Sequence, residues 1–384
     1  MREYKVKKML FVVPGYPTKE DPSYAFIRPI VCACADEGIE SVVFAPQSLS
    51  KNIISKKDRK PCEWMDYTDE GNEIRVYQPM YFSVSNLRCF GIYMSSHFRE
   101  KVLRKLFLKL GYEPDVVYAH FWDMGVCAAN IVEKDIPVIV ASGESKIRVF
   151  ERYQEKIIQR TLQQIKGVVA VSTKNIEESR ELGLLRSNPK TIILPNAIDS
   201  HKFFVRDKSD ARKRLSLSDE DFIGVFVGAF IERKGIKRVL SALETNPDVK
   251  IMLIGSGETI PKSPQIVFQG RVSHEKLSHY LNAADFFVLP TLAEGCCNAI
   301  VEAMACGLPI ISSDLSFNYD VLDTKNAILV NPLNIDEISE AINTLKQNKD
   351  LCKEMSAESL NKAKSLEIKE RIHKLLNFVE NVVS

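Results

Sequence analysis

The 384-residue sequence lacks the features that mark several specialised classes of protein. Its nine cysteines include no CxxC pair and no dense group, which argues against a disulfide scaffold or a zinc site and favours a reducing cytosol. No apolar run approaches ~18 residues, and the first apolar stretch, 9–13, ends at Pro14. We therefore expect a cytoplasmic protein without a signal peptide or a membrane-spanning helix.

An excess of charge is missing as well. Lysine and arginine number 52 and aspartate and glutamate number 50, which gives a formal net charge of +2. This balance provides no cationic field over the whole chain, so nucleic acid is not an expected partner. The length corresponds to two or three domains at roughly 100–200 residues each.

Short β-branched runs alternate with amphipathic helical stretches along almost the whole chain. In the first half the pattern predicts strands at 8–13, 40–45, 116–120, 138–141, 167–171 and 191–194, with helices at 23–36, 122–134, 147–166 and 174–182. In the second half it predicts strands at 222–228, 249–254, 266–269, 286–290 and 309–312, with helices at 237–244, 274–282 and 299–306. Such alternation is typical of parallel, doubly wound sheets.

A polar stretch at 200–221 divides the two halves. We expect an α/β protein with two Rossmann-like domains, 1–197 and 198–366, and a cleft between them. A terminal amphipathic helix at about 367–384 could return to the first domain. The charged segment 51–69 is expected to be a loop.

Ligands of doubly wound sheets bind beyond the carboxyl ends of the strands, where helices begin. The most informative junction of this kind runs from Leu289 to Pro309. Asn298 suits the N-cap of the following helix, and Gly295 lets a ligand approach the backbone closely. Glu294 and Glu302 lie before and on that helix. They could hold two ends of a sugar nucleotide, although one carboxylate of such a pair is usually a solvated helix charge.

A second junction, 228–235, places Arg233 and Lys234 before a helix. Cations oppose the dipole at a helix N-terminus, so an anion such as a diphosphate would favour them there, and a solvated basic turn is the alternative. Two further junctions contain Gly255, Gly257 and Arg271. The glycines are a weak signal, which more often marks a tight turn than a phosphate loop.

Taken in this order and spacing, these segments resemble the retaining nucleotide-sugar glycosyltransferases of family 4, the glycosyl transferases group 1, which have the GT-B fold. The resemblance rests on 228–235, 254–258, 270–272, 284–290 and the two glutamates Glu294 and Glu302 leading into 303–309. It continues more weakly through 194–199 and 12–17. The resemblance implies that this chain is a hexosyltransferase. Its first domain would lie on the acceptor side, and its second domain would bind the donor.

The resemblance implies a role for each matching residue. Glu294 would lie at the donor sugar, Glu302 would accept hydrogen bonds from the ribose, and Lys234 would bind the diphosphate. The implied catalytic residues are Glu294 and Lys234, with His120 as a candidate from the first domain. The implied donor-binding residues are Gly15, Gly228, Arg233, Lys234, Gly257, Arg271, Val272, Glu294, Gly295, Cys296, Cys297, Asn298 and Glu302. No metal or other cofactor is expected beyond the sugar nucleotide.

Two departures from the family pattern leave alternatives open. Ala229 stands where many relatives have arginine, and Arg233 could supply that charge. Ser142-Gly143-Glu144 replaces a motif that begins with histidine, which makes His120 the candidate for contact with the donor, although a histidine at a strand end is often structural. A non-catalytic accessory subunit or a nucleotide-sugar epimerase would fit the same fold.

The expected reaction moves a sugar, with retention, from a nucleoside diphosphate sugar, UDP-sugar being favoured, to a saccharide or lipid-linked saccharide in surface polysaccharide or glycoconjugate synthesis. The predicted helix at 97–110 has an apolar stripe, Phe98, Val102, Leu106 and Leu110, beside five cations, Arg99, Lys101, Arg104, Lys105 and Lys109. Such a helix could lie on the inner face of an anionic membrane, or it could be an ordinary surface helix.

Overall fold

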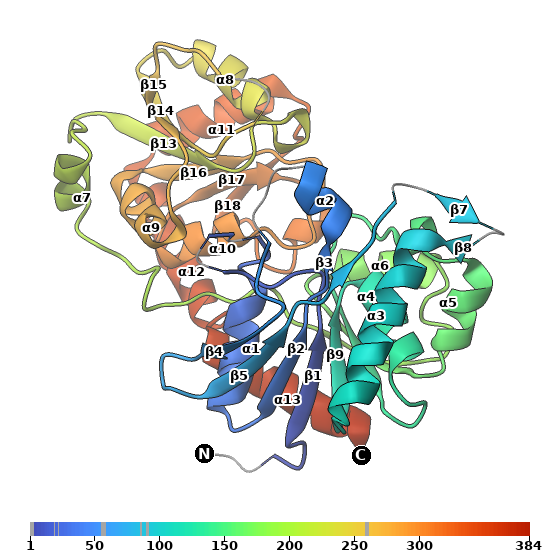
Figure 1. The fold of residues 1–384 in the computed structure, drawn as a ribbon. Helices are drawn as coiled ribbons and strands as arrows, with labels where there is room; N and C mark the ends of the chain where they lie inside the picture. The colour runs from blue at the N-terminus through green and yellow to red at the C-terminus, as the bar shows by residue number, and fades with distance from the viewer. Residues whose placement is uncertain are drawn as a thin grey trace. The chain divides into compact units, whose positions relative to one another are not determined.

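The computed structural model describes residues 4–18, 20–21, 23–54, 59–84, 87–89, 92–257 and 261–384. The chain forms two compact units, Met1–Leu194 with Ile368–Ser384, and Pro195–Glu367. The first boundary falls three residues before the expected position 197, and the second falls one residue after 366. Each unit is an α/β structure, as the alternation of strands and helices predicts (Figure 1).

The first unit is built on one eight-stranded sheet with the order β12-β11-β10-β9-β1-β2-β5-β4. These strands are β12 (Lys190–Ile193), β11 (Ile165–Ala170), β10 (Val138–Ser142), β9 (Val116–His120), β1 (Lys8–Val12), β2 (Glu40–Phe44), β5 (Glu73–Tyr77) and β4 (Glu63–Tyr67). Only β4 pairs antiparallel. The chain leaves β1 toward β2 and later returns to β9 on the other side of β1, so the strand order reverses between β1 and β9.

Helices pack on this sheet, and the buried side chains of the helices and strands form two apolar clusters. α1 (Ile27–Asp36) and the terminal α13 (Ile368–Val383) pack together, and Ile27, Val31, Leu375 and Val379 belong to one cluster. α3 (Met94–Leu110) packs on α4 (Trp122–Ile131), which packs on α5 (Glu155–Thr161). Leu103, Phe107 and Trp122 belong to the other cluster. The remaining elements of this unit are α2 (Leu49–Ile54), α6 (Thr173–Glu181), η1 (Val149–Glu151) and the short strands β3 (Gln47–Ser48), β6 (Met80–Tyr81), β7 (Arg88–Cys89) and β8 (Ile92–Tyr93).

The second unit has a six-stranded parallel sheet with the order β15-β14-β13-β16-β17-β18. Its strands are β15 (Ile266–Gly270), β14 (Val249–Ile254), β13 (Phe222–Val227), β16 (Phe286–Leu289), β17 (Ile310–Ser313) and β18 (Ala327–Val330). Its helices are α7 (Lys208–Arg214), α8 (Ile236–Glu244), α9 (His274–Ala283), α10 (Asn298–Ala305), α11 (Ile335–Gln347) and α12 (Lys349–Lys364), with short turns η2 (Glu232–Lys234) and η3 (Ser316–Asn318). Here the strand order reverses between β13 and β16.

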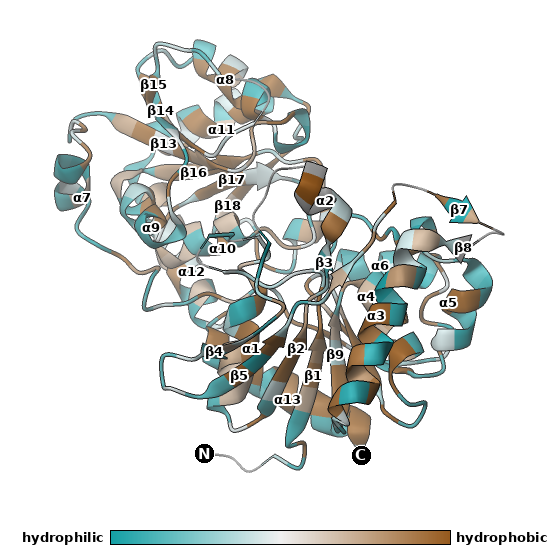
Figure 2. Ribbon diagram, viewed as in Figure 1, coloured by the Kyte–Doolittle hydropathy of each residue, from teal (hydrophilic) through white to brown (hydrophobic). Residues whose placement is uncertain are grey.

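The central strands of both sheets are mainly apolar, which is typical of parallel strands covered by helices on both faces. In Figure 2 the central strands β1, β2 and β9 are coloured largely as hydrophobic, while the helices show both hydrophobic and hydrophilic residues. All five residues of β9 are buried, as expected for a strand covered by helices on both faces. None of the helices in the described ranges is both long and apolar enough to cross a membrane.

Some sequence expectations are wrong. The segment 147–166 is not one helix, because η1 and α5 are separated by a break and β11 begins at Ile165. The segment 51–69 is not simply a loop, since it contains the end of α2 and the whole of β4; its residues 55–58 lie outside the described ranges. The polar stretch 200–221 contains α7.

The basic helix forms as α3, but its buried stripe is shifted by one residue from the expected one. Arg99, Leu103 and Phe107 are buried, whereas Phe98 and Val102 are half-buried. The guanidinium of Arg99 donates to the carboxylate of Asp123 at 3.1 Å and to the hydroxyl of Tyr153 at 3.1 Å. Arg99 therefore belongs to the interior of the first unit and not to its basic surface.

Candidate active site

Three charged residues predicted for the site, Arg233, Lys234 and Glu294, meet where the strand order of the second sheet reverses. The loop after β13 contains η2, and the loop after the neighbouring β16 runs from Pro290 to the start of α10. The N–H of Leu292 donates to the carbonyl of Arg233 at 2.9 Å, and Arg238 donates to the carbonyl of Pro290 at 3.1 Å. Gly235, at φ 84°, has no room for a side chain, since its Cβ would lie 2.6 Å from the Pro290 oxygen.

Glu294 is the centre of this cluster. Its Oε1 accepts hydrogen bonds from Lys234 Nζ at 2.5 Å, from Arg233 Nη1 at 3.0 Å and from Thr291 Oγ1 at 2.8 Å. Arg233 also donates to the carbonyl of Ala293. The side chains of Lys234 and Glu294 are largely buried, at 13% and 12% exposed. An anion beside these two cations was one of the two alternatives that the sequence left open, and in this structure the carboxylate of Glu294 is that anion.

The start of α10 differs from the expectation in one detail. Cys297 occupies the N-cap position, and Asn298 is the first residue of the helix, so the predicted cap is wrong by one residue. The Oδ1 of Asn298 instead accepts from Asn196 Nδ2 at 2.6 Å, and Asn196 also donates to the carbonyl of Cys296 at 2.9 Å. Gly295, Cys296 and Cys297 are buried, and burial raises the pKa of the Cys297 thiol.

Glu302 has a partner that the sequence did not reveal. Its Oε1 lies 2.7 Å from Nε2 of His274, the first residue of α9, and the His274 ring lies 5.0 Å from that of Phe203. The hydrogen bond to Glu302 raises the pKa of His274 above its ordinary value. Glu302 itself is 9% exposed. A histidine at the end of a polar loop gives no periodic signal, so only the three-dimensional contact identifies it.

The glycines of the third junction serve close packing. A Cβ at Gly255 would overlap the carbonyl oxygen of Gly228, and a Cβ at Gly257 would overlap the backbone of Phe230. The N–H of Phe230 donates to the carbonyl of Ser256 at 2.9 Å. The loops after β13 and β14 are therefore in direct backbone contact, which a side chain on either glycine would prevent. Glu258 of the same segment lies outside the described residues.

The fourth junction is tied to the third. Arg271 is exposed, and its Nε donates to Ser256 Oγ at 2.6 Å; the neighbouring Val272 is half-buried. The N–H of Gly255 donates to the carbonyl of Gly270 at 2.8 Å. Hydrogen bonds thus join the loops after β13, β14 and β15 in a row along the carboxyl edge of the sheet.

The two predicted residues of the first unit lie at the carboxyl edge of the other sheet. His120 ends β9 and is 6% exposed, and its Nδ1 has no hydrogen-bond partner in the described part of the chain. Burial, with a contribution from Arg371, lowers the pKa of His120 to about 3, so the ring is neutral at pH 7. Gly15 follows β1, and a Cβ there would lie 2.6 Å from the Tyr24 ring.

Glu144, which stands in the motif that departs from the family pattern, has a clear structural role. Its Oε1 accepts from the N–H of Trp122 at the start of α4, at 2.7 Å. Its Oε2 accepts from Ser142 Oγ and from the N–H of Gly143, both at 2.9 Å. Burial nevertheless raises the pKa of this carboxyl to about 7. Phe121 occupies the N-cap position of α4, and its side chain cannot cap the helix. The Glu144 carboxylate accepts the hydrogen bond that an N-cap side chain would otherwise accept.

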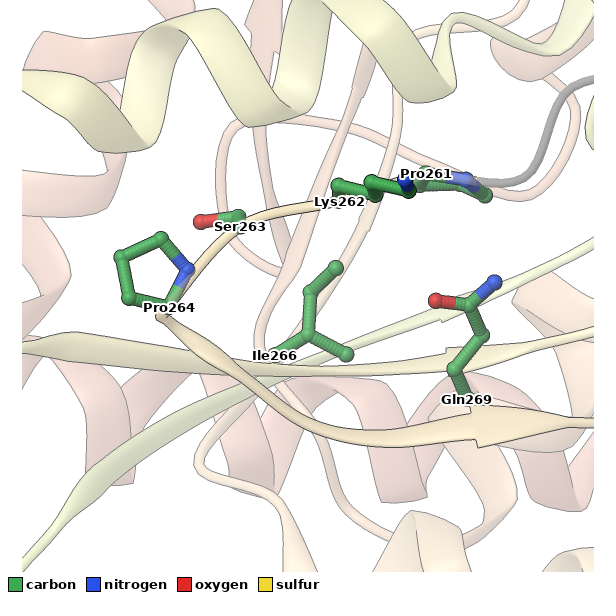
Figure 3. A pocket seen from close by; sticks show the side chains of 6 residues that line it. All are labelled: Pro261, Lys262, Ser263, Pro264, Ile266 and Gln269. Atoms are coloured by element: carbon green, nitrogen blue, oxygen red, sulfur yellow. The ribbon is translucent and has the colours of Figure 1, made fainter.

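A depression elsewhere on the second unit does not include any predicted site residue. Figure 3 shows it beside β15, lined by Pro261, Lys262, Ser263, Pro264, Ile266 and Gln269. Across the ranges that the structure describes, no group of three or more histidine, cysteine, aspartate and glutamate side chains is arranged to hold a metal ion.

Comparison with known proteins identifies the second unit. The family description "Glycosyl transferases group 1" matches residues 207–362. A putative teichuronic acid biosynthesis glycosyltransferase, TuaC of Bacillus subtilis, is 28% identical over 355 residues, which are 87% of this chain and 88% of that protein.

Solved structures match the fold of the whole chain. Sucrose-phosphate synthase from Thermosynechococcus elongatus superposes with a TM-score of 0.77 at 17% identity, covering 98% of this chain and 99% of that one. HepE of Anabaena, solved with UDP, superposes with a TM-score of 0.70 at 15% identity, covering 97% and 100%. Residues 207–362 therefore form a glycosyl transferases group 1 domain, and the chain is a glycosyltransferase with the GT-B fold.

Proposed function

We propose that the chain transfers a hexose, with retention at the anomeric carbon, from a nucleoside diphosphate sugar to a saccharide or lipid-linked saccharide of a surface polysaccharide or glycoconjugate. A UDP-sugar is the favoured donor. TuaC is named for a polysaccharide of this kind, and HepE was solved with UDP, which supports the proposal. The second unit would bind the donor and the first unit the acceptor.

The observation that carries the proposal is the meeting of Lys234, Arg233 and Glu294 where the strand order of the second sheet reverses. This is the place at which doubly wound sheets bind their ligands. The start of α10 follows Glu294 in the same loop and presents backbone N–H groups there. The cluster therefore combines two cations and a helix terminus suited to a diphosphate with a carboxylate suited to sugar hydroxyls.

In the proposed reaction, the bond between the anomeric carbon and the diphosphate oxygen breaks, and a bond to an acceptor hydroxyl oxygen forms. The hydroxyl proton passes to the departing diphosphate, so charge and atoms balance. Negative charge develops on the diphosphate, and preorganised cations aimed at it lower the barrier. We assign that role to Lys234 and Arg233, and we propose that no resident metal ion is needed.

A donor screen tests this proposal. UDP should raise the unfolding temperature more than GDP or ADP, because binding to the native state stabilises it. Glu294→Gln should abolish sugar transfer from the matching sugar nucleotide while UDP still binds. Glu275→Gln, on an exposed side chain of α9, is the control and should transfer normally. Binding of UDP without turnover of any UDP-sugar on polysaccharide or lipid-linked acceptors would favour an accessory subunit instead.

Contact of α3 with an anionic membrane is a separate part of the proposal. Four of its five cations, Lys101, Arg104, Lys105 and Lys109, are exposed, and Leu108 is 60% exposed among them. Basic surfaces of this kind bind anionic lipids at about 1 kcal/mol per cation. Replacing the four cations by glutamine should abolish sedimentation with phosphatidylglycerol vesicles. The control replaces four exposed lysines of the second unit, Lys213, Lys349, Lys353 and Lys364.

A further inference from the structure

The first unit has an aromatic cluster at the point where its strand order reverses. Tyr24 and Phe26 come from the loop between β1 and α1, and His120 and Phe121 come from the end of β9. The ring centroids of Tyr24 and Phe26 lie 6.3 Å apart, and those of Phe26 and Phe121 lie 6.2 Å apart. The His120 ring lies 5.8 Å from Phe26 and 6.0 Å from Phe121. Because β1 and β9 are neighbours, the two loops meet at the position where such sheets bind ligands.

These rings are not buried as core aromatics would be. Tyr24 is 39% exposed and Phe26 is 37% exposed, while His120 lies beneath them at 6%. Tyr24 and Phe26 therefore offer apolar surface to solvent at a predicted functional edge. Exposed apolar groups gathered in this way mark binding surfaces more often than single exposed residues do.

The backbone is strained to hold two of the four residues. Phe121 has φ 75° and ψ 153°, a conformation almost restricted to glycine, and Tyr24 has φ 63°. Within the described ranges the other non-glycine residues with positive φ are Asn188 and Ser216. Asparagine tolerates this region, but tyrosine and phenylalanine do not. Such strain persists where function requires a particular geometry.

The contacts around the strained residues hold them in place. The N–H of Phe121 donates to the carbonyl of Ala141 at 2.8 Å, and Glu144 fixes the next N–H, that of Trp122. The Tyr24 ring covers Gly15 in the space that a Cβ would fill. Gly15, which the sequence assigned to the donor site, is thus the residue that makes room for Tyr24.

The polar groups beside the cluster decide what it could bind. Asp123 follows Phe121 by two residues, and its side chain is 25% exposed. Burial raises the pKa of the Tyr24 phenol, and the charge of Asp123 raises it further. The Oδ2 of Asp123 accepts from Arg99 at 3.1 Å, and Arg99 and Arg152 oppose the effect of Asp123 on the Tyr24 phenol, so the group beside the cluster is an ion-paired carboxylate. A carboxylate has further lone pairs that accept hydrogen bonds from hydroxyl groups. The faces of aromatic rings carry partial negative charge and attract the polarised C–H bonds on the face of a sugar ring.

We propose that Tyr24, Phe26 and Phe121 form a platform that binds a pyranose ring of the acceptor saccharide, with Asp123 accepting hydrogen bonds from its hydroxyl groups. This assignment rests on the proposed transferase function and adds the acceptor-binding residues to it. The hydrogen bond from the Phe121 N–H to Ala141 holds Phe121 in its strained conformation for this contact. Gly15 has no side chain and so leaves the space that the Tyr24 ring occupies.

Saturation-transfer NMR tests the platform with four probes, the methyl glycosides of glucose, galactose, mannose and N-acetylglucosamine, titrated to about 10 mM because contacts of one sugar ring have millimolar dissociation constants. We expect transfer to the ring protons of at least one probe. In Tyr24→Gly and Phe26→Leu its dissociation constant should rise about threefold to tenfold. Tyr24→Gly also relieves the positive φ, so its unfolding temperature should not fall. Tyr67→Ala, on another exposed ring of the same unit, should leave binding unchanged.

Two results would overturn the platform: no transfer to any of the four probes, or transfer that persists with unchanged affinity in both variants. UDP binding to the second unit separates this outcome from the proposed function. Variants that bind UDP normally and have lost the glycoside support the platform. A wild-type protein that binds a glycoside but no nucleotide keeps the platform and contradicts the donor assignment.

Discussion

His274 Nε2 and Glu302 Oε1 lie 2.7 Å apart and join the start of α9 to the buried face of α10. The pair connects the loop that carries Arg271 and Val272 with the carboxylate expected at the donor ribose. Because one carboxylate oxygen is taken by His274, the rotamer of Glu302 is defined before any ligand binds. His274 is thus a positioning residue for Glu302.

This pair predicts different titration of two histidines on α9. Hydrogen bonding to Glu302 raises the pKa of His274, whereas burial lowers that of His279. NMR titration of the imidazole C–H protons should give a midpoint above 6.5 for His274 and below 6.5 for His279. In Glu302→Gln the His274 midpoint should fall and that of His279 should stay. An unchanged His274 midpoint would show that the contact is absent in solution.

The same pair predicts how stability depends on pH. Because the folded pKa of His274 is raised, its contribution is fully present below pH 6.5 and disappears as the pH rises through the folded pKa. The side chain is 59% exposed, so His274→Gln should cost less than about 1 kcal/mol even at pH 6. Urea unfolding of both proteins at pH 6 and pH 9 measures this difference, which should vanish at the higher pH.

Lys234 should decide the affinity for the donor diphosphate. Charge-assisted hydrogen bonds contribute roughly 1.5–3 kcal/mol, so Lys234→Met should weaken UDP binding by about tenfold to a hundredfold. Isothermal titration calorimetry measures this loss, which should be smaller at high salt. Lys237→Met, on an exposed side chain three residues further along the chain, is the matched control. Equal affinities of the two variants would remove Lys234 from the site.

Gly257 should tolerate no side chain. Its Cβ would overlap the carbonyl of Phe230, so Gly257→Ala should destabilise the second unit by roughly 3 kcal/mol or more and weaken UDP binding. Gly71→Ala is the control for backbone strain alone, because Gly71 has φ 87° and no atom within 4 Å of its Cβ position. Gly71→Ala should lower the free energy of unfolding by about 1 kcal/mol. Thermal unfolding that ranks the two variants equally would contradict close contact of the loops.

Much of the fold was predictable because the central strands are apolar on both faces. β9 and β14 lie where the sequence places them, and β10 differs by one residue. The edge strand β4 and its neighbour β5 were missed because charged residues, Glu63 and Asp66 in β4 and Glu73 and Arg75 in β5, interrupt their apolar pattern. Asp66 of β4 is buried only because Tyr16 and Arg28, distant in sequence, hydrogen-bond to its carboxylate.

The site was predictable as a set of loops but not as a set of contacts. Order along the chain places Lys234 and Glu294 in neighbouring loops, yet it does not show that they pair, or that His274 pairs with Glu302. Arg99 was assigned to the surface because helical periodicity cannot reveal Asp123 and Tyr153 beneath it. In each of these cases the place of the side chain depends on a contact with a residue far away in the sequence, which the sequence pattern does not reveal.

Glu144 should make the first unit less stable at alkaline pH. Burial raises its folded pKa to about 7 from the ordinary 4.5, so its contribution is fully present below pH 4.5 and is lost as the pH rises through 7. Relative to Glu144→Gln, the wild-type protein should therefore lose roughly 1–3 kcal/mol between pH 5 and pH 8.5. Urea unfolding at these two pH values measures the loss. Glu177→Gln, on an exposed side chain of α6, should show the pH dependence of the wild type. A Glu144→Gln protein with wild-type pH dependence would mean that the three hydrogen bonds to the carboxylate outweigh its burial.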